Sequence, residues 1–148
     1  MKDTKRSFWL NTAIVLILIV GATLYSMFGG NSGSSLDMRE DGITLSGPGE
    51  FTVSVEFADV ASIEFREEFD RGNCIDGGSE KSYSYGTWEN EEFGTYTLHV
   101  LTKVEACIVM TETDGDIVVF NIESADTTKA FTENLTEHFQ TMGYFAIQ

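Results

Sequence analysis

The chain has 148 residues, of which 24 are acidic and 9 are basic, so its formal net charge at neutral pH is −15. A surface of that sign repels the phosphates of nucleic acids and of anionic lipid headgroups. We therefore exclude nucleic acid as a partner and expect no anionic lipid binding by the soluble part of the chain. The two cysteines, Cys74 and Cys107, lack the C-x-x-C spacing of zinc and redox motifs.

A mainly apolar run, FWLNTAIVLILIVGATLYSMF, occupies Phe8–Phe28 and contains no acidic, basic or histidine residue. At a rise of about 1.5 Å per residue, a helix of this length covers the roughly 30 Å hydrocarbon core of a bilayer. We predict that residues 8–28 form one transmembrane helix.

The short segment before the apolar run, residues 1–7, carries three basic residues against the single acidic Asp3. Positive charge close to a span favours the cytoplasmic side. The sequence therefore predicts a single-pass protein of the cell membrane, with a cytoplasmic N-terminus and an extracytoplasmic C-terminal domain.

A cleaved signal peptide is the alternative interpretation of the same run. The apolar core is longer than the usual 7 to 15 residues of a signal peptide, and Tyr25–Gly29 offers no small-x-small cleavage site. Both interpretations place residues 29–148 in the same compartment.

A flexible linker is predicted over residues 29–41, which begin with GGNSGSS. The first 28 residues hold three of the nine basic residues and one of the 24 acidic ones, which leaves 6 against 23 and a net charge of −17 for the rest. The remaining stretch, residues 42–148, is long enough for one domain with a single core and too short for two.

The first half of this domain is predicted to contain short strands. Ile43–Leu45 is an apolar start, Gly47–Gly49 is a turn, and residues 51–57 alternate between apolar and polar positions as a half-buried strand does. Residues 62–69 resume the alternation. Residues 70–79, DRGNCIDGGS, are rich in Gly and Asp and are predicted to be a loop.

Two hairpins are predicted in the second half. Residues 83–88 and 92–104 pair through the connection at 89–91, and residues 106–111 and 116–123 pair around Asp114-Gly115, a favoured two-residue turn. Ile117–Phe120 is apolar at every position, which indicates a strand covered on both faces.

One amphipathic helix is predicted at the C-terminal end, after a cap at Ser124 or Asp126 and before a stop at Gly143. Its apolar positions recur at spacings of three and four: Ala130 or Phe131, Leu135, His138 or Phe139, and Met142. The fold class is therefore mainly β with a C-terminal α-helix. A curved antiparallel sheet or barrel closed by that helix would bury both apolar faces.

Several short motifs occur in the same order as in a known family. They are Asp59-Val60, Arg71-Gly72, Gly86 and Gly94, Asp114-Gly115, Ile117 with Asn121, and Thr128 with Leu135. Over roughly residues 43–139 the chain resembles the bacterial pleckstrin-homology-like (PH-like) domains of small membrane-anchored proteins. The resemblance implies a curved antiparallel barrel closed by a C-terminal helix. The resemblance implies no reaction, because the family has no reaction in common. Eukaryotic domains of similar shape bind phosphoinositides through a basic cluster, and this chain has no counterpart of that cluster.

The cysteines allow two interpretations. In an oxidising exterior, Cys74 and Cys107 can form a disulfide, which would stabilise the fold by roughly 3 to 4 kcal/mol on the chain-entropy model. Alternatively both are unpaired, and Cys107 is a small buried apolar group.

Oxygen-bearing residues in the predicted loop are the ligand candidates: Asp70, Asn73, Asp76 and Glu80. Their spacing departs from the D-x-D-x-D-G calcium loop, and an acidic solvated loop is the competing interpretation. His99 and His138 are expected at the surface or at its boundary, without a second ligand for zinc.

No catalytic, cofactor-binding or metal-binding set emerges from these patterns. The sequence therefore predicts a non-catalytic, membrane-anchored extracytoplasmic module that interacts with another protein or an envelope component. The alternative is a sensor that binds a cation or a small ligand through the acidic, Gly-rich loop.

Overall fold

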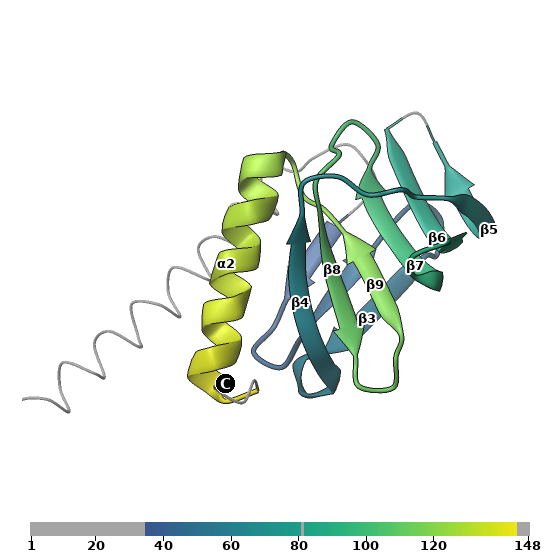
Figure 1. The fold of residues 1–148 in the computed structure, drawn as a ribbon. Coiled ribbons are helices and arrows are strands. Elements are labelled where there is room, and N and C mark those ends of the chain that lie inside the picture. The colour runs from purple at the N-terminus through teal and green to yellow at the C-terminus, as the bar shows by residue number, and fades with distance from the viewer. Residues whose placement is uncertain (1–34, 81, 145–148) are drawn as a thin grey trace, which may run out of the picture.

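The computed structural model describes residues 35–80 and 82–144 (Figure 1). The predicted segments 1–7 and 8–28, and the first part of the predicted linker, lie outside the described residues. Among the residues described, no helix combines the length and the apolar character needed to span a bilayer.

The described chain is mainly β with a C-terminal helix and a curved sheet, as predicted. Its elements are β1 (Ser35–Met38), β2 (Gly42–Ser46), β3 (Thr52–Glu56), the 3-10 turn η1 (Phe57–Asp59), β4 (Val60–Arg66), β5 (Asn73–Ser79), β6 (Tyr83–Asn90), β7 (Gly94–Leu101), β8 (Cys107–Glu112), β9 (Ile117–Phe120) and α2 (Ala125–Met142).

Two sheets form the body of the domain. The small sheet has the order β1-β2-β3, and the large sheet has the order β4-β8-β9-β7-β6-β5. The small sheet lies behind the large one in Figure 1, and α2 runs beside β4. Side chains from both sheets and from α2 meet in the main core, in which Phe57, Met110, Phe120, Leu135 and Phe139 are completely buried.

A second apolar cluster covers the opposite face of the large sheet. It contains Trp88, Leu98 and Val109, and Phe69 packs against it. Phe69 belongs to residues 67–72, a segment that we call the strap. The strap connects β4 at one edge of the large sheet to β5 at the other, and Figure 1 shows it crossing the front of the sheet.

The centre of the large sheet is covered on both faces, as the apolar run in β9 predicted. Val118 and Phe120 belong to the main core, whereas Val119 belongs to the second cluster. Alternate residues of a strand point to opposite faces, so an apolar residue at every position requires cover on both.

The large sheet is not wholly antiparallel, which corrects the prediction. β7 and β9 pair in parallel, with Leu98 opposite Val119. The β8–β9 hairpin explains this arrangement, because β8 pairs with β4 and leaves β9 beside β7. β4 and β9 both run antiparallel to β8, and β9 lies between β8 and β7, where it runs parallel to β7.

The predicted linker over 29–41 is wrong for Ser35–Met38, which forms strand β1. Leu36 lies opposite Leu45 of β2 and is only 7% exposed. A strand of four residues with one buried side chain is too short to stand out from a polar linker by its alternation.

The predicted loop over 70–79 is wrong for Asn73–Ser79, which forms the edge strand β5. Gly77 lies opposite Gly86 of β6, and both have positive φ values, of 128° and 106°. A Cβ on Gly86 would lie 2.1 Å from the Asp76 carbonyl oxygen. Glycine here permits close approach of two strands, although in sequence it indicates a loop.

The ends of α2 follow the prediction. The Ser124 hydroxyl accepts a hydrogen bond from the Thr127 amide, and Gly143 ends the helix in the left-handed conformation. The predicted apolar face is wrong at Met142, which is 55% exposed. Thr128 and Thr132 are buried where α2 packs on the sheets. Each donates its hydroxyl to a backbone carbonyl, which satisfies the hydrogen bonding that a buried polar group requires.

Candidate functional site

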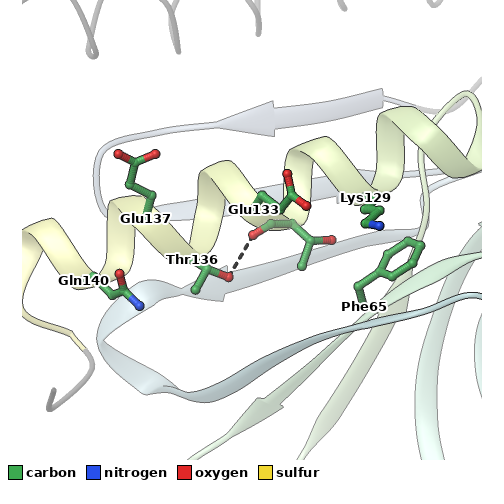
Figure 2. A pocket seen from close by; sticks show the side chains of 7 residues that line it. Phe65, Lys129, Glu133, Thr136, Glu137 and Gln140 are labelled. Atoms are coloured by element: carbon green, nitrogen blue, oxygen red, sulfur yellow. Dashed lines mark hydrogen bonds between the residues drawn. The ribbon is translucent and has the colours of Figure 1, made fainter. Parts of the chain in front are cut away.

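A groove of about 520 Å³ lies between α2 and β4 (Figure 2). One strand residue, Phe65, lines it together with a stripe of helix residues: Lys129, Thr132, Glu133, Thr136, Glu137 and Gln140. The helix side of the groove is therefore polar, and its strand side carries an aromatic ring.

The helix side follows from the helical period. Lys129, Glu133 and Glu137 are spaced by four residues, so they lie on one face at intervals of about 6 Å along the axis. All three are exposed. Thr136, between them, donates its hydroxyl to the Thr132 carbonyl at 2.8 Å (Figure 2), so its hydrogen bonding is satisfied within the helix.

The strand side of the groove is an edge of the large sheet. β4 pairs with β8 on one side, and no described strand pairs with its other side. Its register with β8 shifts near Val60 and is then continuous from Ser62 to Arg66. Phe65 lies opposite Ile108 and is half-buried, so its ring forms part of the groove wall.

The charge near the end of β4 is internally compensated. Arg66 forms ion pairs with Glu64 and Glu92, each at 2.8 Å. These hydrogen bonds raise the pKa of Arg66 above its ordinary value, in spite of partial burial. The charges that line the groove itself are Glu133 and Glu137 against Lys129.

A second cluster of acids lies at the turn between β8 and β9. The carboxylates of Glu112, Asp114 and Asp116 come within 4.8 Å of one another. Asp114 accepts a hydrogen bond from the Asp116 amide at 3.0 Å, which is ordinary turn geometry. Burial, and then the negative charges of Asp114, Asp116 and Asp59, raise the pKa of Glu112. These observations describe a solvated turn and do not require a ligand.

The residues of the strap have structural partners. Asp70 accepts a hydrogen bond from the Gly72 amide through its side chain and from Asn90 through its carbonyl. Tyr96 donates its hydroxyl to the Arg71 carbonyl at 2.6 Å. Burial raises the pKa of Tyr96, so this hydroxyl keeps its proton. Asp70 thus fixes the strap to β6 and is not held free for a ligand.

The other ligand candidates of the predicted loop are spread along the chain. Asn73 and Asp76 lie on β5 opposite Glu89 and Thr87, and Glu80 follows the strand, where its backbone pairs with Tyr83. Within residues 35–80 and 82–144, Asp70, Asp76 and Glu80 do not converge as a group of possible metal ligands. The structure therefore does not assemble the cation site considered for this segment.

The structure does not contain the disulfide considered between Cys74 and Cys107, and both cysteines are free. Cys74 is exposed on β5, whereas Cys107 is buried on β8. The strands β6, β7 and β9 lie between them, a separation of about 19 Å along the sheet and well beyond disulfide reach. Burial raises the pKa of Cys107 to about 12.

His99 contradicts the expectation of a surface histidine, since it is only 3% exposed. Its Nε2 lies 2.9 Å from the Ser46 carbonyl, to which it donates a hydrogen bond across the two sheets. Phe51 and Tyr83 pack against its ring. Burial lowers the pKa of His99 and keeps it neutral at physiological pH. His99 therefore joins the two sheets.

Sequence reasoning missed the groove. Glu133 and Glu137 have the spacing of an ordinary solvated helix face. Phe65, on the other side of the groove, precedes Lys129 by 64 residues in the sequence. The sequence shows the acidic pair at positions i and i+4. Only the tertiary fold places Phe65 in the same groove. The chain matches no protein-family model, no curated protein and no solved structure.

Proposed function

We propose that this protein is a non-catalytic module that is anchored in the cell membrane and contacts a partner protein, or another envelope component, on the extracytoplasmic side. The observation that carries the proposal is the groove between α2 and β4. It combines a strand edge that no strand of the described residues pairs with, a half-buried aromatic ring and exposed charges, which are features of a protein-binding surface.

The sequence supports the membrane part of the proposal. Residues 8–28 have the length and composition of a spanning helix, and the basic residues lie on its N-terminal side. The anchor would hold the domain close to the outer face of the membrane, where a tethered partner meets it at a raised effective concentration.

We also propose kinship with bacterial PH-like domains, supported by the β-rich fold and the terminal helix. The parallel pairing of β7 and β9 is the point at which the fold departs from that expectation. That pairing counts against the kinship, whereas the succession of strands followed by a terminal helix favours it.

Site-specific photo-crosslinking in cells tests the interaction. A photoreactive residue at Gln140, in the groove, should yield a discrete adduct with an envelope component. The same residue at Thr95, exposed on β7 away from the groove, should yield none. Absence of an adduct at Gln140, or equal adducts at both positions, would contradict the proposal.

Protease treatment of intact cells tests the location. External protease should digest the domain without permeabilisation and leave a fragment that contains residues 1–28. A domain that is protected until the membrane is opened would place it on the cytoplasmic side and overturn this part of the proposal.

A further inference from the structure

We infer that the groove binds an extended, basic segment of a partner protein, which adds as a strand to the free edge of β4 and places two cationic side chains against Glu133 and Glu137. The inference rests on the proposed function and specifies the chemistry of the partner. Three features of the groove support it: the backbone of β4, the spacing of the acids on α2, and the arrangement of Phe65 and Lys129.

The backbone of β4 supplies the first part of the recognition. From Ser62 to Arg66 its register with β8 is regular, so alternate backbone groups on the outer side are directed away from β8. No described strand occupies that side. An extended peptide would satisfy these groups by continuing the large sheet, with α2 as a wall beside it (Figure 1).

The spacing of the acids on α2 fits an extended chain. Glu133 and Glu137 are separated by about 6 Å along the helix axis. Alternate residues of a strand, which point to the same side, are about 6.7 Å apart. A peptide with basic residues at positions i and i+2 therefore places one cation against each carboxylate.

The end of the groove near Lys129 has different chemistry. Phe65 lies beside Lys129 at this end, and Figure 2 shows the two side chains together. An apolar residue packs on the ring there, whereas a basic residue would meet the like charge of Lys129. The groove therefore favours one apolar residue at the Lys129 end and two basic residues at the alternate positions beside Glu133 and Glu137.

The charge of the whole domain acts in the same direction. The net charge of −17 on residues 29–148 attracts cationic segments at long range and opposes association with a second copy of the chain. This charge makes the binding dependent on ionic strength. It also requires a control that separates attraction by the whole domain from contact in the groove.

Peptide titration of the full-length protein in zwitterionic detergent provides the test. The probe is the blocked, dye-labelled heptapeptide Thr-Val-Thr-Lys-Thr-Lys-Thr, followed by fluorescence anisotropy at low salt. The counterpart with Glu in place of both Lys residues should bind at least tenfold more weakly. The double variant Glu133→Gln/Glu137→Gln should weaken binding of the basic peptide roughly fivefold. The matched variant Glu40→Gln/Glu91→Gln, which removes two exposed acids elsewhere, should change it less than twofold.

Backbone methylation of the peptide tests strand addition. N-methylation of one alternate set of residues should abolish binding, and methylation of the other set should leave it within about threefold, because only alternate N–H groups face β4. Equal binding of both methylated peptides, or equal effects of the two double variants, would overturn the inference. No binding of the basic heptapeptide would overturn it as well. An adduct at Gln140 in cells, together with any of these results, would leave the proposed function standing with a partner of other chemistry.

Discussion

The two edge strands of the large sheet, β4 and β5, differ in the regularity of their backbones and in how far other elements cover them. β5 is exposed over almost its whole length, has an irregular register between Cys74 and Asp76, and carries Ile75, which is 54% exposed. β4 is regular beyond its first residues, and its residues Ile63 and Phe65 are half-buried beside α2. The register shift between Cys74 and Asp76 and the positive φ of Gly77 make β5 a less regular surface for pairing. β4 keeps a regular backbone to which another strand could add, and α2 lies beside it.

This difference indicates how the chain protects one edge and keeps the other available. At β5 the backbone itself is distorted, so that a second chain meets no continuous row of hydrogen-bonding groups. At β4 the backbone is regular, and charged residues of the adjacent helix decide which chains can approach. Four substitutions test this view, from the largest expected effect to the smallest.

Phe139→Ala should have the largest effect, because Phe139 is completely buried and packs on Phe57 with ring centroids 4.8 Å apart. We expect a loss of about 3 to 5 kcal/mol in the free energy of unfolding, measured by urea denaturation. The β4 edge would lose its helical wall. Met142→Ala, at an exposed position of the same helix, serves as the control and should cost less than about 0.5 kcal/mol. Similar losses for the two variants would show that α2 does not pack as described.

Gly86→Ala tests the β5 edge. The added Cβ would meet the Asp76 carbonyl, and the φ of 106° is strained for alanine, so we expect a loss of about 2 to 3 kcal/mol. Gly94→Ala is the control, because its φ is also positive but no atom lies within 4 Å of the added Cβ. Amide hydrogen exchange should increase in β5 and β6 more than in β4. Uniform exchange in both edges would refute the close glycine pairing.

Tyr96→Phe tests the strap that joins the two edges. It removes the hydrogen bond to the Arg71 carbonyl and keeps the ring in the second cluster. We expect a loss of about 1 kcal/mol and faster proteolysis within residues 67–72. Unchanged proteolysis would mean that Phe69 alone holds the strap.

Glu112→Gln should have the smallest effect and the opposite sign. The pKa of Glu112 is raised in the folded state, so ionisation costs stability as the pH rises above its ordinary value of 4.5. The variant should be more stable by about 0.5 kcal/mol at pH 7 and equal to the parent below pH 4, where the carboxyl is protonated in both states. Thermal unfolding at both pH values measures this, and a gain that persists at low pH would contradict the assignment.

Local patterns predicted much of this fold. A short apolar run indicated β2, alternation identified β3, Asp114-Gly115 marked the turn between β8 and β9, and Ser124 and Gly143 marked the ends of α2. These features depend on nearby residues, so the sequence contains their cause. The same reasoning failed at β5, where glycine serves the approach of a neighbouring strand, and at His99, whose burial is caused by the small sheet.

The sequence by itself determined the class of the fold, the sign of its charge and the prediction of an N-terminal anchor, because periodicity, composition and length carry that information. Only the tertiary structure decided which strands form the edges, that Cys74 and Cys107 lie apart, and that Phe65 of β4 lines a groove together with residues of α2. The physical reason is that strand order is set by contacts between residues far apart in the chain, which no local pattern encodes.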